Sequence, residues 1–218
     1  MNFVDSRCEH EEAEETLPQH SLLEAVYRNQ LNHREIILNG LVDDSVVETV
    51  VMQIFNFNRE DDIAEAEAKS LMGDDYLKVY DRSSYPITVF IHTDGGEVFD
   101  GLSVISAIKG SRTPVHTKAL GKAISMGFMI LISGDRRFCQ HYSRVMYHQI
   151  SYNSGCQTLR DIEEYAEHCG ELQTDLESMV KEWTLIPQDV LDDVFVRKND
   201  LYLTPEQALE WGVVDELF

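Results

Sequence analysis

One serine, Ser125, stands among the small residues of Ala119–Gly127 and is followed by the apolar run Phe128–Ile132. This pattern is typical of a strand that ends in a tight turn, with a hydroxyl at the first turn of the next helix. The N–H groups at such a position favour an incoming or developing negative charge. Ser125 is therefore a candidate nucleophile for acyl transfer, and the alternative is an N-cap serine in a buried corner.

A serine hydroxyl becomes a good nucleophile when a base takes its proton, and a carboxylate commonly holds that base in the correct tautomer. Among the eight histidines of the chain, His148 is the best-placed base because it ends a predicted strand, Ser143–His148. A packed core histidine is the alternative. Composition does not single out the carboxylate, since the chain has 39 acidic residues.

A second turn contains two adjacent glycines, Gly95 and Gly96, and follows the predicted strand Ile87–His92. The carboxyl ends of parallel strands meet at one edge of a sheet, where ligands bind. Paired glycines let the backbone approach a substrate closely and present its N–H groups. With the N–H of Met126, this turn would form an oxyanion hole for an acyl-transfer intermediate.

A scaffold must position these residues, and the sequence predicts one that consists of alternating strands and helices. Strands are predicted at Arg34–Gly40, Ile87–His92, Val115–Leu120, Arg136–Cys139 and Ser143–His148. Helices are predicted from Ser21, from Asp43 or Asp44, across Leu102–Ile108, and from Thr204 to Gly212. The alternation indicates crossover connections and a largely parallel α/β sheet.

The segment Leu159–Trp183 predicts one long amphipathic helix, because its apolar residues recur every three or four positions. At about 1.5 Å per residue, such a helix is longer than a small α/β core needs to cover its sheet. We therefore expect it to project from the core, with a partner subunit against its apolar stripe. The alternative is a helix that lies over its own sheet.

Charge and composition exclude several classes of function. The net charge of −21 at pH 7 argues against nucleic acid or an anionic membrane as a partner, because phosphate contacts need clustered Lys and Arg. No apolar run approaches the roughly 18 residues of a membrane span, and the acidic N-terminal stretch is unlike a secretory signal. We therefore expect a cytoplasmic location, or an organelle if a targeting segment is removed.

The chain has four cysteines without CxxC spacing: Cys8, Cys139, Cys156 and Cys169. They predict reduced thiols rather than a disulfide framework. Cys139 and His141, with His148 nearby, would be the candidates for a metal site. Alternation along a strand explains their spacing better, so no metal is expected.

No linker divides the chain into two large domains. The composition predicts that residues 1–20 form a flexible acidic segment and that residues 21–218 form a single α/β domain. Seven acidic residues between Glu60 and Asp75 mark an insertion at about 58–86. We expect this insertion to be a short exposed helix and a loop on the surface.

Four motifs follow one another along the chain: the Gly95-Gly96 turn, Gly-x-Ala-x-Ser-Met-Gly ending at Gly127, Ser-Arg-Val-Met-x-His-Gln ending at Gln149, and Asp-x-Tyr-Leu-Thr beginning at Asp200. Together they resemble the proteolytic subunit of the Clp protease, over about residues 34 to 217. The resemblance implies a crotonase-like α/β fold, with a mostly parallel sheet, flanking helices and a projecting handle region at about 150–184.

The resemblance also implies roles for individual residues. Three residues match the family's triad of nucleophile, general base and carboxylate: Ser125, His148 and Asp200. The alternatives for the carboxylate are Asp192 and Asp193. Two residues match the amides of the oxyanion hole: Gly96 and Met126. Four residues match the substrate path, which takes up peptide by strand addition: Gly95, Ile150, Ser151 and Tyr152.

By the same resemblance, the protein would be a serine endopeptidase that hydrolyses unfolded polypeptides inside two stacked heptameric rings, a tetradecamer. A AAA+ unfoldase would use ATP to feed the chamber, so no cofactor is expected in this chain. One alternative is a non-catalytic or accessory ring subunit that assembles with an active paralogue. Another is an acyl-CoA enzyme of the crotonase type, which needs no Ser-His pair.

Three features depart from the family pattern. The acidic N-terminal segment replaces an apolar segment that faces the unfoldase in relatives. The insertion at 58–86 lies near the region that shapes the unfoldase-docking pocket. Leu201 stands where many relatives carry an arginine beside the catalytic aspartate. The first two departures bear on docking of an unfoldase, and the third on a switch at the ring–ring interface; the spacing between His148 and Asp200 also differs slightly from the family pattern, which keeps Asp192 and Asp193 as alternatives.

Overall fold

The structure is a computed structural model that describes residues 33–151 and 158–218, without the side chains of residues 159 and 165. The chain divides into two units, Met1–His33 and Arg34–Phe218, and the second holds the sheet. Three predictions lie outside the described residues: the acidic segment 1–20, the helix from Ser21, and the substrate-binding role of Tyr152.

Within the described residues, seven strands form one sheet: β1 (Glu35–Asn39), β2 (Ile87–Thr93), β3 (Val115–Ile124), β4 (Arg136–Cys139), β5 (Arg144–Tyr147), β6 (Leu201–Leu203) and β7 (Glu216–Leu217). The strand order is β1-β2-β3-β4-β7. The strand β5 lies off this path, where it pairs with β3 on one side and with β6 on the other. Every pairing is parallel except that of β5 with β6. The predicted, mostly parallel α/β sheet is confirmed.

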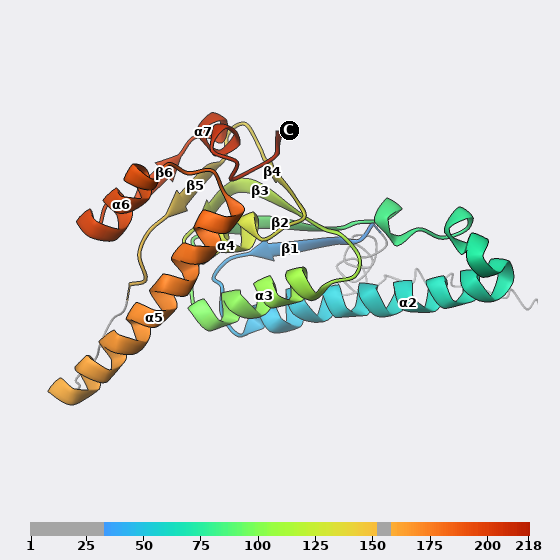
Figure 1. Ribbon diagram of the computed structural model, residues 1–218, viewed down its shortest axis with the longest axis horizontal. Helices are drawn as coiled ribbons and strands as arrows, with labels where there is room; N and C mark the ends of the chain where they lie inside the picture. Colours follow the sequence, from blue (N-terminus) through green and yellow to red (C-terminus); the bar gives the residue numbers. More distant parts are fainter. Residues whose placement is uncertain (1–32, 152–157) are drawn as a thin grey trace, which may run out of the picture. The chain divides into compact units, whose positions relative to one another are not determined.

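Six α-helices accompany the sheet in the described part of the chain: α2 (Met52–Met72), α3 (Val98–Gly110), α4 (Met126–Ile132), α5 (Leu159–Trp183), α6 (Gln188–Arg197) and α7 (Pro205–Glu210). A π-helical turn, Val47–Val51, precedes α2, and two 3₁₀ turns follow it at Gly73–Lys78 and Arg82–Ser84. The helices α2 and α3 lie side by side along the sheet (Figure 1). No helix among the described residues has the length and apolar character needed to cross a membrane.

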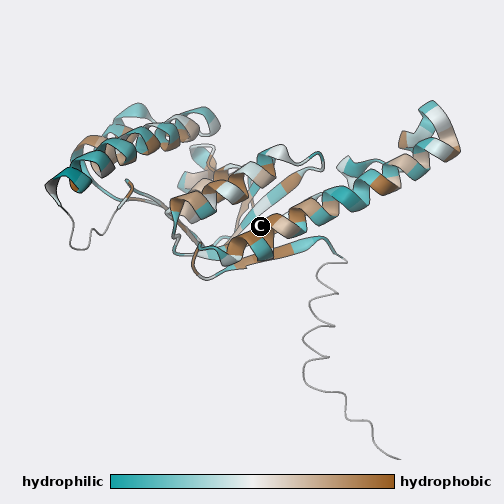
Figure 2. Cartoon of the chain, turned by 90° about the horizontal axis from the view of Figure 1, so that it is seen from below, coloured by the Kyte–Doolittle hydropathy of each residue, from teal (hydrophilic) through white to brown (hydrophobic). Residues whose placement is uncertain are grey.

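The short helix α4 forms the centre of the core. All seven of its residues are buried, and it packs on both β3 and α3. Alternate residues of the central strands β2 and β3 are buried, and Figure 2 shows brown, hydrophobic segments among paler and teal ones along the strands. Because α4 begins directly after Ser125, the core fixes the position of the candidate nucleophile.

The long helix α5 has the bounds that the sequence predicts. It begins with a capping box in which Thr158 and Asp161 exchange hydrogen bonds. Near its C-terminal end, Leu176 and Val180 are buried. Toward its N-terminal end the apolar stripe is open, and Ile162 is 46 % exposed. In Figure 1 this N-terminal part extends beyond the sheet, in agreement with the predicted projecting helix.

The strand β3 is longer than predicted. The sequence indicates a strand that ends at Leu120, but β3 continues to Ile124. A register shift against β2 interrupts it, and Gly121, at φ 76°, donates its N–H to Ser143 Oγ over 2.8 Å. The glycine therefore makes a bulge within the strand instead of ending it. Beyond the bulge, β3 changes partner from β4 to β5.

The prediction of a short exposed helix and a surface loop at 58–86 is correct for the loop, whose 3₁₀ turns have no buried residue, but not for the helix. The helix α2 runs unbroken across residue 58, and one of its faces is buried. Two of the acidic residues expected on a solvated surface, Asp61 and Glu65, are only 1 % and 8 % exposed. The alternation of Ala and Glu concealed this, because the buried face of α2 is built partly from charged residues that have basic partners.

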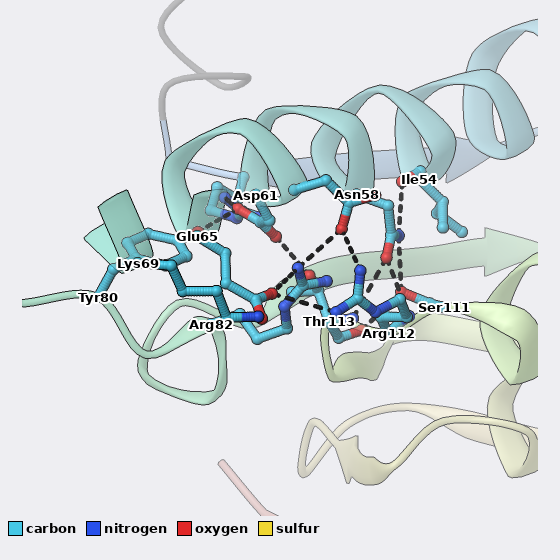
Figure 3. A network of polar contacts seen from close by, with 12 residues as sticks. Ile54, Asn58, Asp61, Glu65, Lys69, Tyr80, Arg82, Ser111, Arg112 and Thr113 are labelled. Atoms are coloured by element: carbon cyan, nitrogen blue, oxygen red, sulfur yellow. Dashed lines mark hydrogen bonds and ion pairs between the residues drawn. The ribbon is translucent and has the colours of Figure 1, made fainter. Parts of the chain in front are cut away.

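These acidic residues belong to a polar cluster that we call the α2 network (Figure 3). It consists of Arg34, Asn58, Asp61, Asp62, Glu65, Lys69, Tyr80, Arg82, Arg112 and Thr113. It ties α2 to the residue before β1, to Tyr80 and the second 3₁₀ turn, and to the loop between α3 and β3.

At the centre of the network, Asp61 receives hydrogen bonds from three residues. Arg34 donates to both carboxylate oxygens, over 2.8 and 2.6 Å, and Thr113 and Tyr80 donate from their hydroxyls. Burial opposes ionisation of Asp61, but these hydrogen bonds outweigh it and lower its pKa. Asp61 is therefore held as a charged and fully engaged carboxylate.

The second carboxylate of the network, Glu65, is held in the same way. Lys69 donates to it over 2.6 Å, Arg112 over 3.1 Å, and Arg82 donates to the same oxygen as Arg112. The hydrogen bonds from Lys69 and Arg82 lower the pKa of Glu65 to about 2. Two guanidinium atoms of the network, Arg34 Nε and Arg82 Nη1, are buried without a partner among the described residues.

Candidate active site

Ser125 lies at the junction of β3 and α4 with an unusual backbone conformation, φ 56° and ψ −119°. Positive φ is uncommon outside glycine and costs roughly 1–3 kcal/mol, which neighbouring contacts must offset. Ser125 N donates to Met146 O over 2.9 Å, and Ser125 O accepts from Phe128 N over 2.9 Å. The turn that carries the serine is therefore held by β5 on one side and by α4 on the other.

The hydroxyl of Ser125 does not cap the helix. Although Ser125 occupies the N-cap position of α4, its side chain accepts no hydrogen bond from the helix. Instead, Ser125 Oγ lies 2.8 Å from His148 Nε2. This distance is within hydrogen-bond range, which is the arrangement that a nucleophile and its base require.

Gly95 lies directly beneath the serine. A Cβ atom on Gly95 would be 2.6 Å from Ser125 Cβ and 2.7 Å from Ile124 O, and its φ of 94° is strained for other residues. Gly96, at φ 153°, packs in the same way on Val42, whose carbonyl oxygen would lie 2.1 Å from a Cβ. Only glycine fits at both positions. The close contact between Gly95 and Ser125 shows that the two predicted turns meet, as expected from a parallel sheet.

Thr93 fixes the glycine turn from the end of β2. Its hydroxyl donates to Gly40 O and accepts from Gly95 N over 2.9 Å, and Thr93 is fully buried. Its methyl group also packs on Gly127, where a Cβ would be 2.4 Å away. Thr93 thereby links the turn to the first residues of α4. The sequence reasoning did not single out this residue.

The backbone N–H groups of Gly96 and Met126 are free of hydrogen bonds within the described residues. Both residues line one small pocket together with Ser125 and His148. Unpaired amides beside a nucleophile are what an oxyanion hole requires, since the anion forms only during the reaction. The structure thus brings together the predicted nucleophile and base with the two residues whose amides are predicted to form the oxyanion hole.

The segment after β5 carries His148 and is anchored by two helices. Gln149 Nε2 donates to Phe195 O of α6, and Ile150 N donates to Gln173 Oε1 of α5 over 2.8 Å. These bonds hold the two residues that directly follow the histidine. The sequence missed Gln173, although a polar residue beside the buried Leu176 of an amphipathic helix is a signal that could have found it.

Asp200 lies immediately before β6, which runs antiparallel to β5. The register pairs Val145 with Leu203 and Tyr147 with Leu201, so the next position along β6 places Asp200 opposite His148. The carboxylate is exposed, and no hydrogen bond joins Asp200 to His148 among the described residues. The structure brings the two backbones together without closing the predicted triad.

The alternative carboxylates are engaged elsewhere on α6. Asp192 accepts a hydrogen bond from Gln188 over 2.7 Å, and Asp193 pairs with Arg197 over 2.8 Å. Both are i,i+4 contacts within the helix. Neither residue hydrogen-bonds to His148 in the part of the chain that the structure describes.

The small pocket that contains this geometry is called the active-site pocket below. Its volume is about 50 Å³. The residues that line it are Gly96, Val98, Ser125, Met126, Met129, Tyr147, His148, Gln149, Ile150, Ser151 and Leu176. Two of the four residues predicted for the substrate path, Ile150 and Ser151, are among them. Gly95 supports the pocket from below Ser125.

The residues considered for a metal site do not gather. Within residues 33–151 and 158–218, no group of three or more His, Cys, Asp or Glu side chains could hold a metal ion. Cys139 is buried, and burial raises the pKa of its thiol to about 11. A thiol in this state is neutral at physiological pH and is neither a nucleophile nor a good ligand.

Comparison with known families agrees with the geometry of the site. The family model described as Clp protease matches residues 76–218, which is well over half of the chain. This chain belongs to the Clp protease family. The match contains β2 to β7 and with them Ser125, His148 and Asp200. The strand β1 lies before it but pairs with β2 in parallel register, so the same sheet extends beyond the matched residues.

A curated relative supports the same family. The chain is 33 % identical over 134 residues to the ATP-dependent Clp protease proteolytic subunit of Deinococcus radiodurans. The aligned residues make up 60 % of this chain and 64 % of the relative. The chain thus matches a little under two thirds of the length of that protein.

Proposed function

We propose that this protein is a Clp-type serine endopeptidase that hydrolyses peptide bonds through Ser125, His148 and Asp200. The observation that carries the proposal is the 2.8 Å contact between Ser125 Oγ and His148 Nε2 beside two free backbone amides. An N-cap serine would instead have accepted a hydrogen bond from α4. The family membership and the proteolytic relative point to the same chemistry.

In the proposed reaction, Ser125 Oγ attacks the carbonyl carbon of the scissile bond while His148 Nε2 takes the hydroxyl proton. The carbonyl oxygen becomes an oxyanion and accepts hydrogen bonds from the N–H groups of Gly96 and Met126. His148 then gives its proton to the leaving amine, and an acyl-enzyme remains on Ser125. Water, deprotonated by His148, attacks the acyl group and restores the free serine.

Asp200 completes the triad in this proposal. For Nε2 of His148 to accept a proton, the ring must carry its hydrogen on Nδ1, and a carboxylate beside Nδ1 stabilises that tautomer. The β5–β6 register favours Asp200 over Asp192 and Asp193, because it continues to the position opposite His148. Catalytic hydrogen bonds are often long in a free enzyme and tighten when substrate binds.

The proposed substrate is unfolded polypeptide, and the proposed assembly is a homo-oligomer of two stacked heptameric rings supplied by a AAA+ unfoldase. The exposed apolar stripe at the N-terminal end of α5, with Ile162 46 % exposed, suits burial against another subunit. No metal or nucleotide in this chain is required by the proposed steps.

The test is a comparison of two serine-to-alanine variants on a fluorogenic, unstructured peptide. Ser125→Ala should lower kcat/KM by about 10⁶-fold, because the remaining residues act only as a unit with the nucleophile. Ser84→Ala, at an exposed serine in a 3₁₀ turn, should cleave at the wild-type rate. Equal activity of Ser125→Ala and wild type would refute the proposal. An intact Ser125–His148 pair gives no support to a non-catalytic ring subunit.

A further inference from the structure

The helix α5 places one polar side chain beside the active-site pocket that the proposed mechanism does not use. Gln173 is partly buried, and its Oε1 accepts a hydrogen bond from the backbone N–H of Ile150 over 2.8 Å. Ile150 lies two residues after His148, and both line the pocket. The contact therefore joins α5 to the segment after β5, residues 148–151, which carries the candidate base.

The segment after β5 has little other support. The strand β5 and its pairing with β6 both end before this segment begins. Between described residues, the backbone groups of the segment form no hydrogen bond other than the one that Ile150 donates to Gln173. The side chain of Gln149 adds one contact, with Phe195 O of α6. Among the described residues, Gln173 is therefore the side chain that holds the backbone of this segment.

The side-chain amide of Gln173 is itself held in one orientation. Its Nε2 donates to Glu177 Oε1, one turn later on α5, over 3.4 Å. The amide also lies beside the hydroxyl of Tyr147: burial and the charge of Glu177 raise the pKa of this hydroxyl, and the Gln173 amide lowers it. Ile150 N can only donate and the Glu177 carboxylate can only accept, so the two partners assign both ends of the amide.

The helix α5 also forms part of the pocket itself. Leu176 lies three residues after Gln173, a spacing that makes them neighbours on the helix surface. Leu176 is buried and lines the pocket, and Ile150 and Ser151 line it from the segment after β5. The hydrogen bond between Gln173 and Ile150 therefore fixes the distance between two linings of the same pocket.

We propose that Gln173 is a positioning residue for peptide binding, which holds the backbone at Ile150 so that Ile150 and Ser151 meet the substrate at a fixed distance from α5. The inference rests on the proposed function, because it assumes that peptide binds in this pocket. The turn that carries Ser125 is held independently, by Met146 O of β5 and by α4. Loss of the Gln173 contact should thus weaken peptide binding more than it slows bond cleavage.

The experiment measures KM and kcat separately for the full-length assembled protein, as wild type and as Gln173→Met. Methionine has a similar length and helix propensity but cannot take the place of the amide oxygen. The KM for an unstructured fluorogenic peptide should rise about tenfold, the value of one neutral hydrogen bond, while kcat changes by less than about threefold. A KM within about twofold of wild type would overturn the proposal, and so would a loss confined to kcat.

A matched control makes the same chemical change away from the pocket. Gln188 of α6 donates to Asp192 over 2.7 Å at i,i+4, as Gln173 does to Glu177, but it is exposed and does not line the pocket. Gln188→Met should leave KM unchanged, and an equal rise in this variant would count against a specific role for Gln173.

Labelling of Ser125 by a fluorophosphonate separates this inference from the proposed function. The reagent needs the serine, its base and the two amides but no bound peptide, so Gln173→Met should be labelled at the wild-type rate. A much slower rate would place the effect on the chemistry and overturn the inference. Absence of labelling in wild type refutes the proposed function, whereas normal labelling with an unchanged KM refutes only the role of Gln173.

An exchange of the two side chains on α5 tests the accepting oxygen itself. Glu177→Gln alone should keep KM near wild type, because the Gln173 oxygen still accepts from Ile150 N. In the double variant Gln173→Glu with Glu177→Gln, the carboxylate at position 173 accepts from Ile150 N, and the amide at position 177 donates to that carboxylate. The KM of the double variant should therefore stay within about twofold of wild type. A KM as high as that of Gln173→Met would show that this hydrogen bond does not position the segment, and the inference would be wrong.

Discussion

The α2 network and the active-site pocket both place polar groups in the interior. They differ in whether those groups have hydrogen-bond partners within the protein. In the network, each buried carboxylate accepts hydrogen bonds from three donors, as Asp61 does from Arg34, Thr113 and Tyr80. In the pocket, the backbone amides of Gly96 and Met126 have no partner among the described residues. The carboxylates of the network are paired internally, whereas the pocket leaves two amide donors beside the candidate nucleophile.

The comparison also concerns charge. The network buries ionised side chains, which are tolerable only when opposite charges and hydrogen bonds surround them. The pocket contains mainly neutral donors, which can remain unpaired at a cost of about 1–3 kcal/mol each until a substrate arrives. The network is therefore expected to govern stability and the pocket to govern catalysis, and variants in each should separate these two properties.

The largest effect is expected at the base. His148→Ala should lower kcat/KM by about 10⁶-fold, because the serine loses the group that takes its proton. The melting temperature should change little, since His148 is only half-buried. The control is His141→Ala at an exposed position of the same region, and a comparable loss in this variant would contradict the assignment of the base.

The next effect is expected at the carboxylate. Asp200→Asn should lower kcat by about 10⁴-fold, because an amide stabilises the wrong tautomer of His148. Asp193→Asn, whose carboxylate pairs with Arg197, should retain activity within about twofold. If the two variants exchange these outcomes, Asp193 and not Asp200 completes the triad. Peptide kinetics on both variants decide between them.

Within the network, removal of one charge should destabilise the fold without altering the chemistry. Asp61→Ala should cost about 3–5 kcal/mol of unfolding free energy, because it removes a fully buried carboxylate and leaves the mostly buried Arg34 without its partner. Asp75→Asn should cost less than about 1 kcal/mol, since Asp75 and Lys78 are 62 % and 72 % exposed. Urea unfolding measures both. Equal effects in the two variants would contradict the structural role of the network.

A smaller effect is expected at the turn that supports the serine. Gly95→Ala should reduce kcat/KM by at least about 100-fold, because the new methyl group would displace Ser125 from His148. Gly110→Ala is the matched control, as a Cβ there meets no atom within 4 Å. It should preserve activity and slightly increase stability. Full activity of Gly95→Ala would show that the close contact is not needed for catalysis.

The smallest effect is a pH dependence of the network. The pKa of Glu65 is lowered to about 2 in the fold, against roughly 4.3 in an unfolded chain. Its contribution to stability is therefore complete above about pH 5 and is lost as the pH falls toward 2. The destabilisation caused by Glu65→Gln should thus be larger at pH 6 than at pH 3. A pH-independent difference in urea midpoints would contradict the lowered pKa.

Much of the site could be predicted from the sequence, because its parts are local patterns at the ends of strands. Ser125, His148 and the Gly95-Gly96 turn each follow a recognisable strand, and a parallel sheet must bring such ends together. The bounds of α5 were also predictable from its regular apolar spacing. The orientation of the Asp200 carboxylate was not, because it depends on a short strand of three residues, β6.

The errors arose where tertiary contacts override local pattern. Acidic residues of α2 resemble a solvated face in the sequence, and only the distant Arg34, Arg82 and Arg112 explain their burial. Gly121 resembles a strand end, but the strand continues because β5 replaces β4 as its partner.

The most direct test of the account is the site of covalent modification by a fluorophosphonate. The reagent reacts only with an activated serine whose developing oxyanion is stabilised, and so reports the contact with His148 and the amides together. Peptide mapping by mass spectrometry should place a single stoichiometric adduct on Ser125, with none in His148→Ala. An unmodified Ser125, or an adduct that forms equally fast without His148, would contradict the assignment of this pocket as the active site.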